Sequence, residues 1–288
     1  MPVSSTRYTL LALLFCVLWA SAFVALKIAL RFSPPLTVMS SRFLLAGAGM
    51  LVYARLRGAR FPSTAREWAP IALIGVLNNA LYLGTTSVTL QYISAGMGAV
   101  LASTNPLLLT LLAPWLLGER LTIARVAGLL TSFAGVAIVM WSRLGDQNRP
   151  IAMAVFLGAT VFMAAGTIAF KRLRPAQDLR VITGGQVLAG GIALIVPSLV
   201  FESLDAVHVT PELIIAQAYL AIATSSAAML LWTWLLRHGD ATRASAWFFL
   251  NPVLGLALGA VLLGEPLRVV DFAGSAAVAL GIYVVQRA

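Results

Sequence analysis

Few side chains in this sequence are of the types that catalyse reactions or bind metals. Cys16 is the only cysteine, which excludes an internal disulfide, a thiolate metal cluster and paired-thiol redox chemistry. The two histidines, His208 and His238, are far apart in the sequence and offer fewer ligands than a zinc site needs. No Gly-x-x-x-x-Gly-Lys-Ser/Thr phosphate loop is present. We therefore expect no enzyme activity, no nucleotide hydrolysis, no metal and no cofactor.

The composition is that of an integral membrane protein. The 288 residues are 60% hydrophobic and 10% charged, with a mean hydropathy of +0.92, whereas a soluble domain is about 25% charged. A helical span needs about 20 mostly apolar residues. Ten such runs cover residues 8–26, 36–54, two parts of 68–118 divided at 91–94, 126–142, 150–170, 181–201, 213–236, 244–264 and 272–286. The predicted fold is all-α, with ten transmembrane helices.

The basic residues predict how these helices are oriented. The net charge is +10, and the Lys and Arg residues flank the apolar runs. With a cytoplasmic N terminus, fourteen of them fall on the cytoplasmic side and five on the outer side, while Arg42 lies inside a helix. This bias predicts a bacterial-type inner-membrane protein with both termini in the cytoplasm. Because topology accounts for the charge, we expect the lipid bilayer and no nucleic acid as a partner.

The chain contains one pattern twice. A shift of 146 residues aligns Asn105-Pro106 with Asn251-Pro252 and gives 13 identities over residues 105–139. We predict two five-helix repeats, residues 1–145 and 146–288. Because five is odd, the second repeat enters the membrane inverted relative to the first. Inverted repeats are typical of secondary transporters that work by alternating access, although a channel can use the same symmetry.

Several short motifs resemble those of the EamA-type drug/metabolite transporters. They are Trp-Ala-Ser-Ala-Phe at 19–23, Arg-Phe at 42–43, the helix-4 Asn-Pro with Leu-Gly-Glu-Arg-Leu-Thr at 117–122, and Leu-Gly-Glu-Pro-Leu at 263–267. The resemblance covers both repeats. It implies a carrier whose first, third, fourth, sixth, eighth and ninth helices surround a central cavity, with the fifth and tenth at the periphery. Within the superfamily the chain most resembles the YddG-type exporters of aromatic and other neutral amino acids.

Polar and aromatic side chains within the apolar runs are the candidate substrate-binding residues. A polar group in hydrocarbon is costly unless it is paired or faces a water-filled cavity. The candidates are Trp19, Ser21, Asn78, Asn79, Tyr82, Ser103, Asn105, Met163, Thr167, Ser225, Trp232, Trp247 and Asn251. The alternative for the polar residues is hydrogen bonding between helices. For the tryptophans and the methionine, the alternative is ordinary helix packing.

Three further residues within helices are candidates for substrate binding or for movement. Arg42 interrupts the second apolar run. It either anchors a substrate carboxylate or closes a gate, or its side chain extends to the outer interface, roughly 9 Å away. Pro106 and Pro252 each remove a helical hydrogen bond. They are either hinges for rocking of the repeats or static kinks.

The positions of the acidic residues limit the mechanism. All ten fall in predicted loops or at helix ends, whereas proton or cation coupling usually requires an acid or a histidine within the membrane. We therefore expect gradient-driven export of aromatic or neutral amino acids, or of similar small metabolites, by a monomer or homodimer. A multidrug efflux carrier and a channel for small neutral solutes remain the alternatives. Saturable flux with counterflow distinguishes a carrier from a channel.

Overall fold

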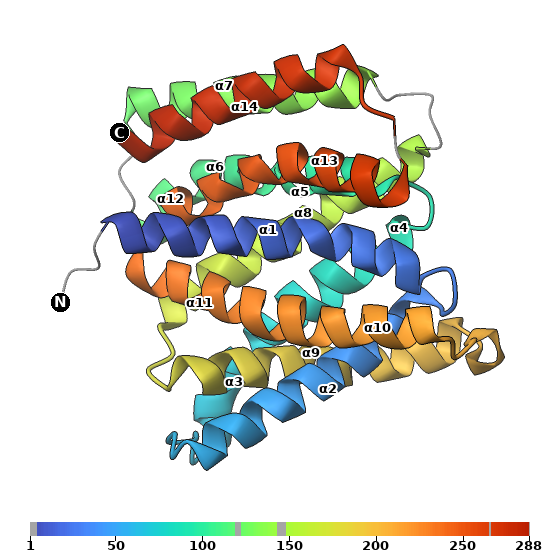
Figure 1. The fold of residues 1–288 in the computed structure, drawn as a ribbon. Helices are drawn as coiled ribbons and strands as arrows, with labels where there is room; N and C mark the ends of the chain where they lie inside the picture. The colour runs from blue at the N-terminus through green and yellow to red at the C-terminus, as the bar shows by residue number, and fades with distance from the viewer. Residues whose placement is uncertain (1–4, 119–121, 143–147, 265, 288) are drawn as a thin grey trace.

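The structure, a computed structural model, describes residues 5–118, 122–142, 148–264 and 266–287 (Figure 1). The first half of the chain forms α1 (Ser5–Ala29), α2 (Pro35–Leu56), α3 (Ala65–Gly75), η1 (Val76–Gly84), α4 (Thr85–Thr89), α5 (Ala95–Ala102), α6 (Asn105–Leu117) and α7 (Ile123–Ser142). The second half forms α8 (Pro150–Leu173), α9 (Leu179–Phe201), η2 (Leu204–Ala206), α10 (Pro211–Tyr219), η3 (Leu220–Ala228), α11 (Met229–His238), α12 (Ala241–Ser245), η4 (Ala246–Leu250), α13 (Asn251–Leu263) and α14 (Val269–Arg287). All regular elements in these described ranges are helical, which confirms the predicted fold class.

Ten apolar helical segments are present in the described part of the chain. Eight of them, 22 to 28 residues long, are long and apolar enough to cross a bilayer, and two shorter ones cover Ile123–Val139 and Val269–Val285. Continuous helices are expected because hydrocarbon offers no partner for a free backbone group. Several spans are built from consecutive elements, such as α10, η3 and α11 in Pro211–His238. The predicted division of 68–118 is confirmed, since one span ends at Thr89 and the next begins at Ala95.

Side-chain caps and prolines mark where many of the helices begin. The Thr64, Ser94 and Thr210 hydroxyls each accept a hydrogen bond from a backbone N–H three residues later. Such caps satisfy N–H groups that have no partner within the helix. Pro35 and Pro150 occupy the first position of α2 and α8, where the missing proline N–H costs nothing. Local sequence signals therefore mark these starts.

The two halves are interrupted at corresponding positions. The π-helical segments η1 and η3 are both nine residues long and begin 144 positions apart, at Val76 and Leu220. In the fourth span the helix unwinds at 103–104, and in the ninth η4 is a 3₁₀ helix that ends just before Asn251. The prolines that follow thus stand at the first turns of α6 and α13 rather than within an unbroken helix. The π segments were not predicted from the sequence, and such segments are frequent at functional sites.

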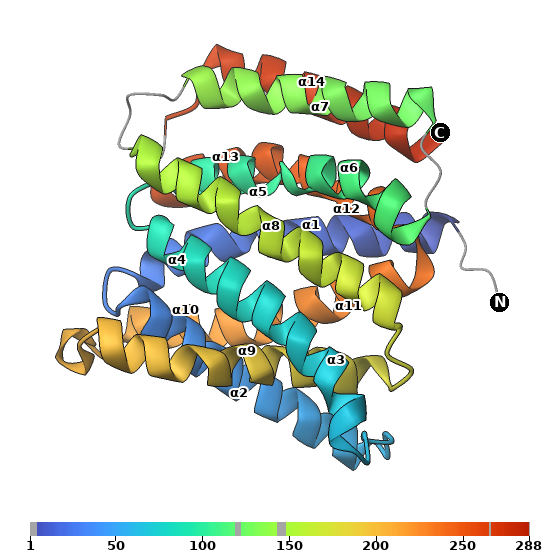
Figure 2. The same cartoon turned by 180° about the vertical axis from the view of Figure 1, so that it is seen from behind.

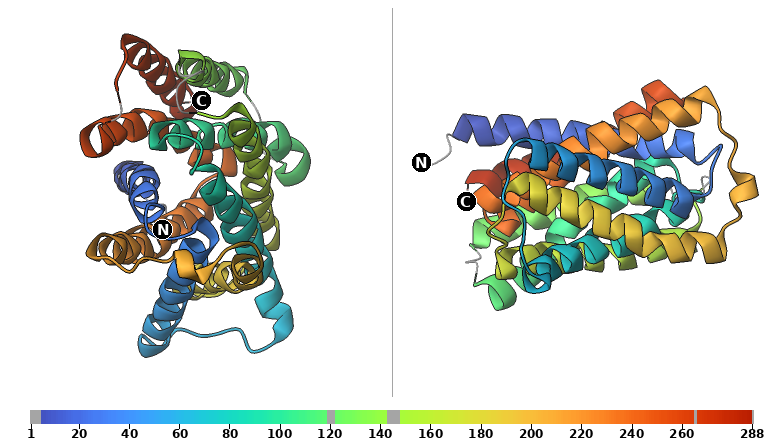
Figure 3. Two further views of the ribbon diagram at one scale, coloured as in Figure 1. Left: turned by 90° about the vertical axis from the view of Figure 1, so that its right-hand side faces the viewer. Right: turned by 90° about the horizontal axis from the view of Figure 1, so that it is seen from below.

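Equivalent helices of the two halves are antiparallel. Gly128 of α7 lies against Gly281 of α14, and Gly135, seven residues later, lies against Gly274, seven residues earlier. The residues at which α2 and α9 approach each other closely also run in opposite order along the two helices. An odd number of spans per repeat requires this reversal, and it confirms that the repeats are inverted. The α7–α14 pair stands at one side of the molecule and the α2–α9 pair at the other (Figures 1 and 3).

The remaining helices fill the space between these two pairs. Seen from behind, α8 crosses the molecule diagonally between α3 and α4 on one side and α6 on the other (Figure 2). It contacts η1, α3, α4 and α6, while α1 contacts α10, η3, α11 and α13. The peripheral position of α7 and α14 agrees with the placement expected for the fifth and tenth helices. The space enclosed by α1, α2, α8 and the π-helical spans is where a central cavity forms.

The αL caps that end α6 and α13 are another mark of the repeat. Gly118 and Gly264 follow these helices with φ of 68° and 69°. A residue with a Cβ rarely adopts this left-handed conformation, so glycine is the residue that fits. The glutamates that follow them, Glu119 and Glu265, lie outside the described residues, as does the predicted junction between residues 145 and 146.

Candidate functional site

A cavity lies between α1, α2 and the two spans that contain π-helical segments. We call it the central cavity. Its lining residues are Trp19, Ala22, Phe23, Leu26, Met39, Arg42, Phe43, Leu83, Thr86, Leu90, Thr224, Ser225 and Met229. Both halves of the chain contribute to the wall, and most of the wall is apolar. Such a cavity suits a small solute with a large apolar part and few polar groups.

Helical periodicity determines which residues reach the central cavity. The α1 residues in the wall are Trp19 and those three, four and seven positions later, which share one face of a helix. In α2, Met39, Arg42 and Phe43 are related in the same way. Each helix therefore presents one continuous stripe to the cavity. Because a helix turns by about 100° per residue, a residue two positions from Trp19, such as Ser21, faces elsewhere.

A smaller recess adjoins the central cavity. We call it the inner recess; it is lined by Trp19, Asn78, Tyr82, Leu83, Met163, Met229 and Trp232. Trp19, Leu83 and Met229 belong to both walls. Five candidates from the sequence thus meet in one place, namely Trp19, Asn78, Tyr82, Met163 and Trp232. Met163 brings α8 into the wall, as expected for the sixth helix.

Several polar atoms around these two spaces are buried and lack a hydrogen-bond partner among the described residues. They are Trp19 Nε1, Asn78 Oδ1, the Tyr82 hydroxyl and the Ser225 hydroxyl. A buried polar group left unpaired is costly, and native proteins rarely keep one without a reason. Gathered at a cavity, these atoms are available to hydrogen-bond a solute or water.

Arg42 is the charged member of the cavity wall. Its side chain is 3% exposed, and the guanidinium carbon lies 4.6 Å from the centre of the Phe43 ring. Among the described residues, Nε and Nη1 have no hydrogen-bond partner. This placement differs from the alternative of a side chain that reaches the outer interface. The tertiary structure instead turns the guanidinium inward, against an aromatic face that stabilises a cation.

Some of the predicted residues make hydrogen bonds within the protein and do not line the cavity. Asn79 Nδ2 donates to the Gln186 carbonyl oxygen across η1 and α9, at 3.1 Å. The Ser103 hydroxyl donates to the Val100 carbonyl at 2.6 Å, and the Thr167 hydroxyl donates to the Met163 carbonyl at 3.0 Å. The two hydroxyls are thus bonded within their own spans, whereas Asn79 bonds to another helix through Nδ2 and its buried Oδ1 has no partner among the described residues.

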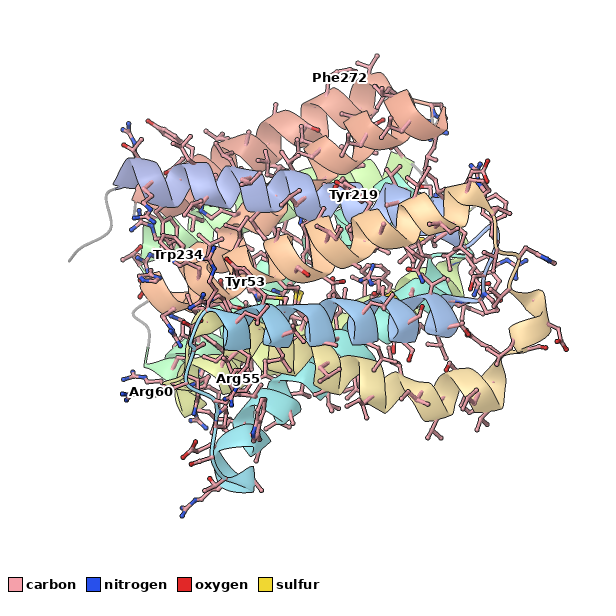
Figure 4. All side chains as sticks on the ribbon, turned by 60° about the horizontal axis from the view of Figure 1, so that its bottom comes forward. Tyr53, Arg55, Arg60, Tyr219, Trp234 and Phe272 are labelled. Atoms are coloured by element: carbon pink, nitrogen blue, oxygen red, sulfur yellow. The ribbon has the colours of Figure 1, made fainter. Side chains whose placement is uncertain are left out.

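Ser21 also lies off the cavity. Its hydroxyl donates to the Leu18 carbonyl at 2.9 Å and lies 2.7 Å from the Tyr219 hydroxyl. Tyr219 stands on α10, on the face of the molecule shown in Figure 4. Ser21 is two positions from Trp19, so the turn of the helix directs it to another neighbour. It connects α1 to α10 in this structure.

The fourth and ninth spans contribute no described lining residue to either space, which differs from the placement that the resemblance implied. Asn105, Asn251 and Trp247 are buried, and their side-chain nitrogen and oxygen atoms have no partner among the described residues. The ninth span still contacts the residues of the wall through Phe248 of η4, whose ring centre lies 5.5 Å from that of Trp19 and 5.0 Å from that of Trp232.

Backbone and side-chain hydrogen bonds tie the helix ends together. At the end that carries both termini, Lys171 donates to the Gly239 carbonyl, and Arg237 donates to the Pro175 and Gln177 carbonyls at 2.9 Å each. At the opposite end the Glu202 carboxylate accepts from the backbone N–H groups of Leu36 and Thr37, at 2.7 Å each. A wide recess lined by Arg31, Gln91, Glu202 and His208, among others, opens at that end. Both ends of the molecule thus contain contacts between helices that are distant in the sequence.

The sequence did not single out several of the wall residues. Met39, Phe43, Leu83 and Met229 are apolar and do not stand out among many similar residues. One available signal was helical spacing, since Arg42 and Phe43 lie three and four positions after Met39 and so share one face of the helix. Leu83 and Met229 carry no such signal, because the π-helical segments that end at Gly84 and Ala228 were not predicted.

Together these features define a class of protein. A multi-pass helical membrane protein with inverted repeats around a buried amphipathic cavity has the architecture of a secondary transporter. The chain belongs to the EamA-like transporter family, whose model matches residues 6–141 and again residues 150–287. The family resemblance predicted from the short motifs is thereby confirmed.

Curated relatives span nearly the whole chain. The chain is 26% identical to the uncharacterized transporter YvbV of Bacillus subtilis, over 98% of this chain and 92% of that protein. It is 29% identical to a probable amino-acid metabolite efflux pump of Salmonella typhimurium, over 95% of this chain and 93% of the relative. A solved crystal structure of a protein with 22% identity matches 99% of this chain and 98% of its own, with a TM-score of 0.80. That likeness supports the fold.

Proposed function

We propose that this protein carries aromatic or other neutral amino acids, or small metabolites of similar size, out of the cell by alternating access. The observation that carries the proposal is the buried space between the two halves, in which polar atoms without protein partners face apolar and aromatic walls. Trp19 Nε1 can donate a hydrogen bond, and the Tyr82 and Ser225 hydroxyls can donate or accept. Sites of this kind orient a small amphipathic solute through a few polar contacts.

In this proposal the repeats 1–145 and 146–288 exchange conformations, so that the central cavity faces each side of the membrane in turn. The helix breaks before Asn105 and Asn251 act as hinges. Among the described lining residues of the central cavity and the inner recess, none carries a carboxylate. Passage then follows the gradient of the solute without an obligatory proton.

The name of a relative supports the class of solute and the direction of transport, and the basic end of the molecule supports its orientation in the membrane. The Salmonella relative is named as a probable amino-acid metabolite efflux pump. Both termini lie at the same end of the molecule (Figure 1), and Arg55 and Arg60 stand at that end with Tyr53 and Trp234 (Figure 4). A basic end with aromatic side chains is typical of the cytoplasmic membrane boundary. We therefore place this end in the cytoplasm.

Reconstitution in liposomes tests the proposal. Purified full-length protein is incorporated, and labelled phenylalanine, leucine and a cationic dye are compared, with and without a pH gradient. We expect saturable amino-acid flux that is accelerated by unlabelled amino acid on the far side and is independent of the pH gradient. Linear flux without counterflow would identify a channel. Strict dependence on the pH gradient, or transport of the dye alone, would contradict the proposed mechanism or substrate.

A further inference from the structure

The charge of Arg42 has no counter-ion in the cavity wall. The side chain is buried, and its Nε and Nη1 atoms have no hydrogen-bond partner among the described residues. Burying a cation away from water is costly unless an opposite charge accompanies it. Contact with the Phe43 ring offsets only part of this cost. The cavity therefore carries an uncompensated positive charge in this structure.

Glu202 is an acid that contacts α2, but its carboxylate is already engaged. Its two carboxylate oxygens accept the backbone N–H groups of Leu36 and Thr37 and the Thr37 hydroxyl, at 2.7 to 2.9 Å. These contacts cap the start of α2, five residues before Arg42, a rise of about 7.5 Å along the helix. The carboxylate thus stabilises the N terminus of α2 and does not neutralise the guanidinium.

The unpartnered polar atoms are mostly hydrogen-bond donors. Arg42 Nε and Nη1 and Trp19 Nε1 can only donate, and the Tyr82 and Ser225 hydroxyls can donate as well. The only pure acceptor among the unpartnered side-chain atoms described at these walls is Asn78 Oδ1, in the inner recess. A carboxylate is an acceptor-only group with a single negative charge, and an arginine fork can bind it at two points. An ammonium group can bond to Asn78 Oδ1 and to the two hydroxyls, but it meets the like charge of Arg42 in the same cavity.

We infer that the central cavity preferentially binds monoanionic carboxylic acids with an apolar or aromatic body. The carboxylate lies on Arg42 and the body lies against Trp19, Phe43 and Leu83. This inference rests on the proposed function and narrows it: among solutes with the same side chain, the acid without an α-amino group binds more tightly than the zwitterionic amino acid. The amine without a carboxylate does not bind.

A set of ligands that share one phenylethyl body tests the preference directly. 3-Phenylpropionate, phenylalanine and phenethylamine are titrated against the purified full-length protein in detergent, with tryptophan fluorescence and thermal shift as readouts. We expect the affinity order phenylpropionate, then phenylalanine, with phenethylamine not binding. Equal or tighter binding of phenylalanine would overturn the inference. So would binding of phenethylamine.

Substitutions at Arg42 separate charge from shape. We expect Arg42→Gln to reduce phenylpropionate affinity by about 30-fold or more, since it removes one partner of a buried charged pair, and to abolish the preference over phenylalanine. Arg42→Lys keeps the charge, and we expect it to keep the same order of affinities among the three ligands. Arg60→Gln, on an exposed loop residue at the cytoplasmic end, is the matched control and should leave all affinities unchanged. An unaltered ligand order in Arg42→Gln would overturn the inference.

The result of the binding titrations can be distinguished from the result of the transport experiment. If the wild-type protein binds phenylpropionate in this order but shows no counterflow in liposomes, the carrier proposal fails and the ligand assignment stands. If counterflow occurs with amino acids in preference to the desamino acid, the carrier proposal stands and the ligand assignment fails. If Arg42→Gln does not fold, the wild-type ligand order and the Arg42→Lys variant still decide the question.

Discussion

Gly166 of α8 lies directly against the Asn78 side chain of η1, and a methyl group placed on Gly166 would overlap the Asn78 amide. This contact joins the first helix of the second repeat to the π-helical segment of the first repeat. It also fixes the amide at the inner recess, where Asn78 Oδ1 has no partner among the described residues. The position of a candidate substrate-binding group thus depends on the absence of a side chain on a helix from the other half.

The first prediction follows from this contact. We expect Gly166→Ala to displace Asn78, lowering both the apparent solute affinity and the melting temperature. Gly158 is on the same helix and has open space around it. Gly158→Ala is therefore the control, expected to be neutral or stabilising by up to about 1 kcal/mol, the helix propensity gain. Thermal denaturation and counterflow of both variants provide the comparison, and equal behaviour would contradict the role of Gly166.

The adjacent asparagines should respond differently. Asn79 donates a hydrogen bond to the Gln186 carbonyl, so Asn79→Ala removes a buried link between η1 and α9 and should cost about 0.5–1.5 kcal/mol of stability. Asn78→Ala removes an atom that has no internal partner, and we expect a loss of solute affinity with little loss of stability. Melting temperatures and binding titrations of both variants separate the two effects. The reverse pattern would reject the assignment of Asn78 to the inner recess.

Removal of the Tyr82 hydroxyl is expected to affect binding alone. That hydroxyl is buried and has no hydrogen-bond partner among the described residues, so Tyr82→Phe breaks no internal bond and should leave the protein as stable or more stable. Loss of one hydrogen bond to a neutral solute group lowers affinity by about 3- to 10-fold. Tyr283→Phe, at an exposed tyrosine on α14, is the control. A clear drop in melting temperature for Tyr82→Phe would indicate a structural role instead.

The proline positions offer a test of hinge movement. Pro106 and Pro252 stand in the first turns of α6 and α13, and Pro114 lies inside α6. If the breaks are hinges, replacing Pro106 and Pro252 together with alanine should lower the transport rate several-fold while solute affinity stays unchanged. Stability should change little, since proline at a first turn breaks no helical bond. Pro114→Ala serves as the control, and unchanged transport in the double variant would remove the hinge hypothesis.

The start of α9 predicts a dependence of stability on pH. The Asp178 carboxylate accepts from the Arg180 backbone N–H at 2.8 Å and from the Arg180 guanidinium at 2.7 and 2.9 Å. The hydrogen bond from the Arg180 side chain holds the pKa of Asp178 below its ordinary value. Because the folded pKa is lowered, the stabilisation is present above the ordinary pKa of about 3.9 and is lost as the pH falls through the folded value.

We therefore expect Asp178→Asn to lower the melting temperature at neutral pH by about 1–2 °C, a small shift because both side chains are partly exposed. The difference from the wild type should vanish as the pH falls through the lowered pKa of Asp178. Asp205→Asn, at an exposed residue of η2, is the control and should show no such convergence. A difference that persists at low pH would contradict the role of the Asp178 charge.

The residues of the site could be predicted only in part. The intramembrane polarity of Asn78, Tyr82 and Ser225 was visible in the sequence, and so was that of Asn79 and Ser103. Nothing local distinguishes the first three, which line a wall, from the last two, whose polar atoms bond to backbone carbonyls. The difference arises from the neighbour that each residue meets, which is a property of helices distant in the sequence.

The sequence by itself determined the ten apolar spans, the repeat and the corresponding helix breaks. The physical reason is that hydrocarbon forces each apolar run into a helix that satisfies its own backbone, and a repeated pattern with an odd number of spans must be inverted. The tertiary structure alone decided how each helix is rotated about its axis. A rotation of about 100° separates consecutive residues, so packing placed Trp19 and Arg42 at the cavity and turned Ser21 toward Tyr219.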